Sequence, residues 1–441
     1  MTYTQAIDYL NEKLPQFHRV GSSAYRPGLE NARRLAGWLG NPHRKYPCIH
    51  VAGTNGKGTV SNLLASVLQE AGYRVGLYTS PHLKDFRERI RVNGKMVPEE
   101  FVCDFVERYE AASRRPPFQD TPLSEPFEPS FFELTTGMAF GYFALEKVDV
   151  AVVETGLGGR LDSTNLIVPE VSVITSISFD HMAILGNTLE AIAGEKAGII
   201  KKGVPVAVGK NPPEVCEVMR REALRMESEL HLADEEFHLE VLEAPASDSL
   251  RQHFRISGPE GLCFDDLACG LAGYYLRENA LTALTALRLL QDRFALSAEH
   301  IRRGFADVLS NTGLRGRWET LSTHPLCLCD IGHNEAGIRQ VSAQLQALSC
   351  RTLHIVFGVV NDKDIGRMLP LMPRNAVYYF TKPSIERALP ETQLAALAAE
   401  AGLSGSVWPS VAQAKAAALA AAGPDDVVFI GGSNYVVAEA L

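Results

Sequence analysis

One short glycine-rich stretch constrains the fold of this 441-residue chain more than any other feature. Residues 50–60 read HVAGTNGKGTV, with the apolar run PCIHVAG leading into the glycines and the helical pattern TVSNLLASVLQEAG leading out of them. A strand that turns through glycines into a helix brings backbone N–H groups and the positive end of the helix dipole to one point, where they bind phosphate. Lys57 adds a positive charge there. The stretch therefore predicts a phosphate-binding loop within an α/β fold.

The glycine spacing differs from that of the common nucleotide loop, which has a glycine, four residues and then Gly-Lys-Ser/Thr. Here Gly53 lies three positions before Gly56, and Gly58 separates Lys57 from Thr59. Taken alone, the string also fits an ordinary glycine-rich turn. The strand before it and the helix after it favour the phosphate loop.

The rest of the sequence alternates apolar runs with helical patterns. Further strands are predicted at YRVGLYTS, VDVAVVETG, EVSVITSIS and VPVAVG, which indicates an α/β domain with a mainly parallel sheet. The five prolines of residues 116–129 predict a loop. A second alternation has strands at LCLCDIG, TLHIVFGVV, AVYYFT, SVWPS and DVVFIGGS. We expect two domains, 1–296 and a smaller Rossmann-like 297–441, with a hinge near 296–314.

Composition narrows the class of protein. The chain is 46% hydrophobic and 22% charged, and its formal net charge of −9 at pH 7 argues against a general nucleic-acid binder. Its N-terminus is polar where a signal peptide would be apolar, and no apolar stretch approaches the length of a bilayer span. We therefore expect a cytoplasmic protein without membrane contact. The eight cysteines include no CxxC pair, which argues against a disulfide framework or a zinc site.

Polar residues follow three of the predicted strands. Ser80 follows VGLYT, Glu154 follows DVAVV, and Asp180 and His181 follow VSVITSISF. Ligands of open α/β sheets bind at the carboxyl ends of the strands, so these side chains could hold the magnesium ion of a bound nucleotide. Each also has an ordinary interpretation as a turn residue, a solvated strand end or a helix cap. Their coincidence downstream of one phosphate loop favours the metal site.

Seven short motifs, in order along the chain, carry a family resemblance. They are GTNGKGT (53–59), YTSPHL (78–83), ETGLGGRLDSTN (154–165), DHMAILGNT (180–188), GEKAGII (194–200), RGRWE (315–319) and DIGHNEAG (330–337). Together they resemble the folylpolyglutamate synthase and dihydrofolate synthase family, a branch of the Mur-ligase-like ATP-dependent amide-forming enzymes. The resemblance implies a Mur-ligase-like central ATPase domain with a phosphate loop. The family loop commonly reads GTxGKG before Ser or Thr, so Gly58 is a family feature.

The resemblance implies a role for each matched residue. ATP would be held by Asn55, Gly56, Lys57, Gly58, Thr59, Asn279, Arg317 and Asp330. Magnesium, as a pair of ions, would be held by Ser80, Glu154 and His181. Lys57, Glu154, His181 and Lys196 would take part in catalysis. In this family the lysine that matches Lys196 is carbamylated by carbon dioxide and becomes an anion; an ordinary surface or phosphate-binding lysine is the alternative.

The resemblance also implies the substrates. Members with both synthase activities carry GGRLD and an aromatic pair before a glutamate, and this chain has GGRLD at 158–162 and SFFE at 130–133. The positions that resemble the dihydropteroate site are Ser130, Phe131, Phe132, Glu133, Leu161, Asp162 and Ser163. FFELTTGMAFGYFAL also fits the start of a buried helix. The implied reaction adds L-glutamate to dihydropteroate and to reduced folates through an acyl phosphate, in a monomeric enzyme.

Three alternatives stay open. The chain could have folylpolyglutamate synthase activity alone. It could be another Mur-type amino-acid ligase, but a ligase for a nucleotide-linked muramic acid needs a whole domain before the phosphate loop, and only about 50 residues precede it here. An ATP-binding regulatory module would bind ATP without ligase turnover. That alternative leaves Glu154, His181 and Lys196 without a purpose.

Overall fold

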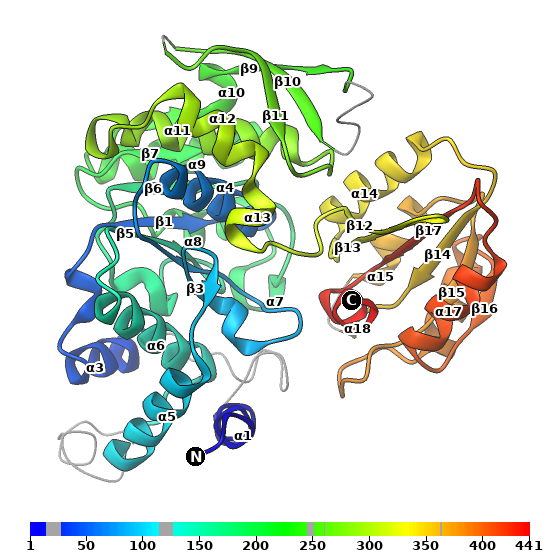
Figure 1. Cartoon of the computed structure of the whole chain (residues 1–441), viewed down its shortest axis with the longest axis horizontal. Helices are drawn as coiled ribbons and strands as arrows, with labels where there is room; N and C mark the ends of the chain where they lie inside the picture. The colour runs from blue at the N-terminus through cyan, green and yellow to red at the C-terminus, as the bar shows by residue number, and fades with distance from the viewer. Residues whose placement is uncertain (15–27, 114–126, 245–250, 260, 362–363) are drawn as a thin grey trace.

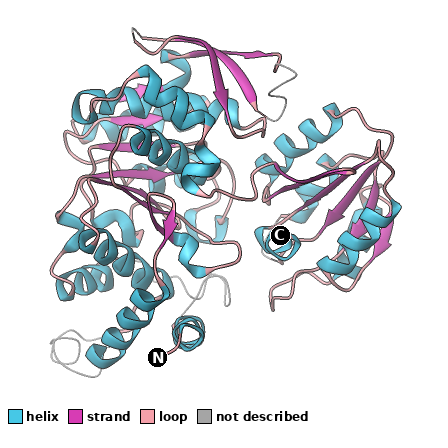
Figure 2. Cartoon of the chain, in the orientation of Figure 1, coloured by secondary structure: helices cyan, strands magenta, loops and turns pink. Residues whose placement is uncertain are grey.

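Each of two domains that lie side by side is built on one large sheet (Figures 1 and 2). The computed structural model describes residues 1–14, 28–113, 127–244, 251–259, 261–361 and 364–441. Most of the predicted loop at 116–129 lies outside these residues. Within them, no helix is long and apolar enough to cross a membrane.

The first domain is built on an eight-stranded sheet of order β4-β3-β2-β5-β1-β6-β7-β8. Its strands are β1 (Cys48–Ala52), β2 (Val75–Tyr78), β3 (Ile90–Val92), β4 (Lys95–Met96), β5 (Val150–Glu154), β6 (Val171–Ile174), β7 (Val206–Val208) and β8 (Leu230–Leu232). The strands β2, β5, β1, β6, β7 and β8 lie next to one another in that order, and each neighbouring pair is parallel. At the other edge, β3 pairs antiparallel with β2, and β4 pairs antiparallel with β3. The mainly parallel sheet is as predicted.

Helices cover both faces of this sheet because its strands are apolar on both faces. On β5, Val150 and Val152 face one core, and Ala151 and Val153 face the other. The first core is closed by α4 (Lys57–Glu70), α11 (Leu276–Phe294) and α12 (Ala298–Ala306), and the second by α1 (Tyr3–Lys13), α3 (Glu30–Trp38), α5 (Glu99–Ser113) and α6 (Phe131–Leu145). The far end of the sheet packs against α8 (Leu189–Ala197) and α9 (Pro213–Arg225).

A small antiparallel sheet that the sequence analysis did not predict covers the outer side of the first core (Figure 1). Its order is β11-β10-β9, with β9 (His238–Leu242), β10 (Gln252–Ser257) and β11 (Phe264–Cys269). Phe254 and Leu267 pack into the core beside α11. The short α10 (Ala233–Glu236) connects β8 to β9.

The C-terminal domain is a six-stranded sheet of order β12-β13-β17-β14-β15-β16. Its strands are β12 (Glu319–Thr323), β13 (Leu326–Asp330), β14 (Leu353–Phe357), β15 (Val377–Phe380), β16 (Gly405–Val407) and β17 (Val427–Gly431). Only β12 pairs antiparallel. The helices are α14 (Glu335–Ala347), α15 (Ile365–Met368), α16 (Glu391–Glu400), α17 (Val411–Ala421) and α18 (Asn434–Ala440). The five predicted strands are present, in a Rossmann-like layered domain.

The packing boundary between the domains lies later than the expected 296/297. Residues 298–312 form α12 and α13 (Val308–Thr312), and Ile301, Phe305 and Val308 lie in the same core as α4. A Cβ on Gly304 would lie 2.5 Å from the Cα of Val67, so α12 and α4 are in close backbone contact. The first core therefore extends to about residue 312, because the apolar face of α12 is buried on α4 and not on the C-terminal sheet.

Candidate active site

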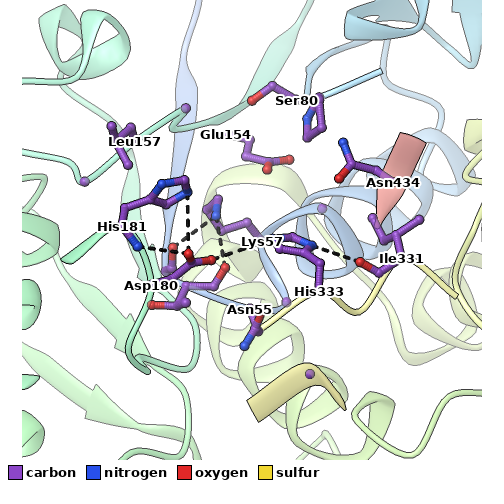
Figure 3. Close-up of a pocket in the computed structure, with 18 of the residues that line it drawn as sticks. Asn55, Lys57, Ser80, Glu154, Leu157, Asp180, His181, Ile331, His333 and Asn434 are labelled. Atoms are coloured by element: carbon purple, nitrogen blue, oxygen red, sulfur yellow. Dashed lines mark hydrogen bonds and ion pairs between the residues drawn. The ribbon is translucent and has the colours of Figure 1, made fainter. Parts of the chain in front are cut away.

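A cavity of about 440 Å³ lies between the two domains, at the carboxyl ends of strands from both sheets (Figure 3). This is where open α/β sheets bind ligands, and the volume is that of a small-molecule site. Every predicted site residue lines it. These residues are Asn55, Gly56, Lys57, Gly58, Thr59, Ser80, Ser130, Phe131, Phe132, Glu133, Glu154, Leu161, Asp162, Ser163, His181, Lys196, Asn279, Arg317 and Asp330.

The glycine loop joins β1 to α4 through a conformation that only glycine adopts easily. Gly56 has a φ of 92° and caps α4, and a Cβ there would lie 2.2 Å from Oδ1 of Asn279. Lys57 is the first residue of the helix, and its Nζ donates to the carbonyls of Gly53 at 3.0 Å and Thr54 at 3.2 Å. The ammonium group is thus folded over the loop, beside the helix N-terminus.

The extra glycine, Gly58, has a spatial reason. A Cβ on it would lie 3.2 Å from Nη2 of Arg317 and 3.6 Å from Oε2 of Glu154. Arg317 belongs to the segment that leads into the C-terminal sheet, and Glu154 ends β5. The missing side chain therefore lets a cation and a carboxylate from different parts of the chain approach the first turn of α4.

Glu154 is a buried carboxyl with one unused oxygen. Within the described part of the chain, its Oε2 has no hydrogen-bond partner, and Figure 3 shows the side chain between Ser80 and Lys57. Burial raises the pKa of this carboxyl to about 7, against the opposing charges of Lys57 and Arg317 and a hydrogen bond from the Ser80 backbone. A cation bound at this unused oxygen would offset the cost of burial and favour the ionised carboxylate.

The predicted metal ligands fit magnesium better than a metal held by protein alone. Across the described ranges, no group of three His, Cys, Asp or Glu side chains could hold a metal ion by itself. Ser80, Glu154 and His181 supply one hydroxyl, one carboxylate and one imidazole at the cavity wall. Mg²⁺ is usually bound through one or two carboxylates, here Glu154, and completes its shell with phosphate oxygens and water. His181 has a left-handed φ of 50° and caps α7 (Met182–Leu185).

Lys196 is buried in the last turn of α8 and points at the glycine loop. Its Nζ donates to the carbonyl oxygen of Gly53 at 2.7 Å, the same atom that accepts from Lys57. Burial, and then the charge of Lys57, lower the pKa of Lys196 to about 7. Two amino groups therefore converge on one carbonyl, and a substantial fraction of Lys196 is neutral near pH 7.

Asp330 ends β13 and connects the two domains. Its Oδ2 accepts from the Tyr275 hydroxyl at 2.7 Å and the Trp318 amide at 2.8 Å, and its Oδ1 accepts from the Gly332 amide at 2.8 Å. Burial raises the pKa of the carboxyl, while the hydrogen bond from Tyr275 opposes this. Tyr275 caps α11 and was not predicted, because nothing in its local sequence marks it as a site residue.

The comparisons with known proteins decide the family. The Mur ligase middle domain matches residues 133–287, and the Mur ligase glutamate ligase domain matches residues 316–434. The Bacillus subtilis dihydrofolate synthase/folylpolyglutamate synthase is 40% identical over 351 residues, 78% of each chain. The chain belongs to the dihydrofolate synthase and folylpolyglutamate synthase family.

Two further relatives extend the similarity over the whole length of this Mur-type ligase. The folylpolyglutamate synthase of Lacticaseibacillus casei is 33% identical over 440 residues, which is 99% of this chain and 97% of the relative. The structure of Escherichia coli FolC in complex with DHPP and ADP has a TM-score of 0.84 at 32% identity, and covers 100% of this chain and 97% of that one.

In this ligase, the predicted aromatic pair lies at the start of a buried helix and also lines the cavity. Ser130 and Glu133 form a capping box on α6, with the Ser130 amide donating to Glu133 at 2.6 Å and the Glu133 amide donating to Ser130 at 3.2 Å. Phe132 covers Gly156, where a Cβ would lie 2.4 Å from its ring. The helix-start interpretation of SFFE is therefore confirmed. Its predicted role at the dihydropteroate site stays a prediction.

Asp162 of the ligase organises the loop that follows β5. Its Oδ2 accepts from the amides of Gly156 and Leu157 at 2.9 Å each, and its Oδ1 accepts from the amide of Thr164 at 3.0 Å. Leu161 and Ser163 are thereby held at the cavity wall. The carboxylate of Asp162 acts here through the loop backbone, so its predicted substrate role stays a prediction.

Among the described residues that line the ligase's cavity, one buried charged side chain was missed by the sequence analysis. Arg89 is 1% exposed, lines the cavity, donates from Nε to His82 at 2.7 Å and lies 5.1 Å above the ring of Phe131. Its surroundings, RERIR, are typical of a charged surface segment. Only the tertiary structure, which places Arg89 over Phe131 at the start of α6, shows that this arginine points inward.

Proposed function

We propose that this ligase joins L-glutamate to dihydropteroate, giving dihydrofolate, and to reduced folates, giving polyglutamates, at the expense of ATP. One observation carries the proposal: a phosphate loop with Lys57 and an aromatic wall with Phe131 and Phe132 line the same interdomain cavity. A site that transfers phosphate to the carboxylate of an aromatic acid needs a loop that binds the phosphates and an apolar wall that binds the aromatic rings. Relatives named for both activities, and similar over most of the chain, support it.

The proposed chemistry needs no protein nucleophile. A carboxylate oxygen of the folate or pteroate attacks the γ-phosphorus of ATP and ADP leaves, which gives an acyl phosphate. The glutamate amine then attacks the acyl carbon, and the tetrahedral intermediate expels phosphate. Lys57, once it turns from its carbonyl partners to the nucleotide, neutralises charge on the transferred group, while Asn279 and Arg317 orient the nucleotide.

Magnesium would be held by Ser80, Glu154 and His181 together with phosphate oxygens. When bound, it neutralises negative charge on the phosphates. The unpartnered Oε2 of Glu154 supports this assignment, because a buried carboxylate oxygen without a hydrogen bond is costly unless a cation binds it. We propose that two magnesium ions bind at this site together with ATP.

Carbamylation of Lys196 is also part of the proposal. The neutral amine attacks carbon dioxide, an N–C bond forms, and one proton leaves to solvent. The lowered pKa of Lys196 supports this, because only a neutral amine is nucleophilic. The product is an anion, which attracts Lys57 and Mg²⁺ where the ammonium group repels them. Carbon-13 NMR with labelled bicarbonate tests this directly: a carbamate signal is expected in the wild type and not in Lys196→Ala.

Phosphate release tests the function. Pure protein with ATP and Mg²⁺ is given dihydropteroate or tetrahydrofolate, with and without glutamate. We expect both acids to stimulate release with glutamate, and Lys57→Ala to lower it about 100-fold or more. Stimulation by tetrahydrofolate alone would leave folylpolyglutamate synthase activity only. Release with neither acid would exclude the folate function and favour a regulatory ATP-binding module. A monomeric, cytoplasmic enzyme stays a prediction.

A further inference from the structure

The N-terminus of α14 contacts two separate loops of the first domain through a single side chain. Asn334 is the N-cap of this helix and is 5% exposed. Its Nδ2 donates to Oδ1 of Asn55 at 3.0 Å, and its Oδ1 accepts from Nδ2 of Asn55 at 3.1 Å. Asn55 lies in the phosphate loop, between Gly53 and Gly56. The two amides thus form a reciprocal pair across the domain junction.

The same side chain also contacts the segment that carries a predicted metal ligand. Nδ2 of Asn334 donates to Oδ2 of Asp180 at 3.1 Å, and Oδ1 of Asp180 accepts from the backbone amide of His181 at 2.9 Å. Nε2 of His333 lies 3.6 Å from Oδ2 of Asp180. Figure 3 shows Asn55, Asp180 and His333 around the same part of the cavity. One residue of the C-terminal domain therefore contacts both the phosphate loop and the His181 segment.

Helix capping alone explains only half of these contacts. A cap needs an acceptor, and Oδ1 of Asn334 accepts from the Gly337 amide at 2.9 Å. Ser410 caps α17 and Ser433 caps α18 in the same domain, each through a hydroxyl oxygen. The NH₂ group of Asn334 has no part in capping, and both of its recorded partners lie in the first domain.

We propose that Asn334 is a positioning residue that couples closure of the C-terminal domain to the arrangement of the phosphate loop and the His181 segment. This inference rests on the proposed ligase function and adds a residue to it. When the domains close, the Asn334 amide fixes Asn55 and Asp180 relative to each other. When the domains open at the 313–318 connection, both loops lose this contact at once. The site is therefore assembled only in the closed molecule.

Two substitutions separate the two roles of Asn334. Asn334→Asp and Asn334→Ser each keep an oxygen that can cap α14, but neither can donate to both Asn55 and Asp180. Asn334→Asp also places a second carboxylate against Asp180, whereas Asn334→Ser adds no charge. The matched control is Ser410→Ala, which removes the cap of α17 in the same domain.

We expect both Asn334 variants to lower kcat about tenfold or more with dihydropteroate and with tetrahydrofolate, because an interaction of the closed state is lost. The Kd for a non-hydrolysable ATP analogue, measured by calorimetry, should rise far less than kcat falls. In small-angle scattering, the analogue should decrease the radius of gyration of the wild type and of Ser410→Ala more than that of either Asn334 variant. Ser410→Ala should lower the melting temperature and leave kcat unchanged.

A double-mutant cycle tests the pairing itself. Asn55→Ala combined with Asn334→Ser should lower kcat no further than the more severe single variant, because both changes break the same amide pair. Multiplicative losses would show that the two residues act independently and would overturn the inference.

The outcomes also distinguish this inference from the proposed function. If the wild type releases no phosphate with either acid, the function fails first. If the wild type turns over and Asn334→Ser retains its kcat, Asn334 is only a helix cap, even if Asn334→Asp is impaired by the added charge. A loss of kcat that matches a loss of melting temperature in both variants would equally overturn the positioning role.

Discussion

At the scale of single residues, the two glycines that flank Lys57 carry different constraints. Gly56 needs its left-handed φ of 92° and has no room for a Cβ beside Asn279. Gly58 lies inside α4, and its hypothetical Cβ meets the movable end of the Arg317 side chain at 3.2 Å. The constraint on Gly56 therefore affects folding. The constraint on Gly58 affects only the position of the Arg317 side chain beside the phosphate loop.

Substitution of these glycines should therefore separate stability from activity. We expect Gly58→Ala to raise the free energy of unfolding by about 0.5–1 kcal/mol, because alanine is the better helix residue, and to lower kcat/KM for ATP about tenfold as Arg317 is displaced. Gly56→Ala should lower both stability and activity. Denaturant titration and phosphate release measure the two effects. A Gly58→Ala enzyme with unchanged kcat/KM would show that Arg317 has no fixed position at the loop.

At the scale of elements, helix starts and strand interiors hold polar groups that serve the fold. Ser130 and Glu133 cap each other at the start of α6, although the sequence suggested a substrate role for both. His50 lies in the middle of β1, fully buried, with Nε2 2.8 Å from the hydroxyl of Thr164. The cap of α6 and the buried histidine of β1 each lead to a testable prediction about stability.

Removal of the α6 cap should cost stability. We expect Ser130→Ala to lower the free energy of unfolding by about 1 kcal/mol, whereas Ser130→Asp, which can still cap, should lose little. If Ser130 acts only as a cap, the KM for dihydropteroate stays the same in both variants. A raised KM in Ser130→Ala with unchanged stability would instead support its predicted contact with the substrate.

The buried histidine of β1 should make the fold sensitive to acid. Burial, and then the charge of Lys201, lower the pKa of His50 from 6.5 to about 3. The unfolded chain therefore binds a proton as the pH falls below 6.5 while the folded chain does not, so stability is lost from pH 6.5 downward. Between pH 7 and 5 this loss amounts to about 2 kcal/mol.

His50→Gln removes this titration. Between pH 7 and 5, the free energy of unfolding of the wild type should fall by about 2 kcal/mol more than that of His50→Gln. This difference does not depend on how much stability the variant has already lost at pH 7. Chemical denaturation at the two pH values measures the difference. Parallel pH dependences of wild type and variant would show that His50 does not cause the sensitivity.

At the scale of the whole molecule, one connection joins the two domains, and the site lies where the domains meet. The first core includes Ile301, Phe305 and Val308, so it extends beyond the expected boundary at 296. Burial of three such side chains contributes about 6 kcal/mol, which is comparable with the whole stability of a typical domain.

Fragments of the chain test this boundary. A fragment of residues 1–314 should unfold cooperatively on heating, because it retains α12 and α13 against α4. A fragment of residues 1–296 should be largely unfolded or aggregate, because the apolar face of α4 is exposed. Calorimetry and circular dichroism measure both. Equal melting temperatures for the two fragments would place the boundary at 296 after all.

The local sequence was sufficient to predict those elements that a short stretch of residues specifies. Apolar runs such as those of β5 and β17 predict buried parallel strands, and the glycine loop is one continuous motif. The ordered motifs also predicted that Lys57, Glu154 and Lys196 share a site, and all three line one cavity. The antiparallel sheet of β9, β10 and β11 was missed, because its strands are partly exposed and their apolar residues do not form such runs.

Tertiary structure alone decided which core each segment joins and which distant side chains meet. The helical pattern of α12 is compatible with either domain, and only its fit on α4 assigns it to the first. The local sequence predicts a surface charge for Arg89, and only its contact with Phe131 at the start of α6 shows that it is buried. Asn55 and Asn334 are 279 positions apart, and no local pattern pairs them. The sequence by itself thus determined the family, the elements with a strong local pattern and the chemical groups of the site, because these depend on short motifs. The meeting of those groups depends on long-range packing, which no short stretch encodes.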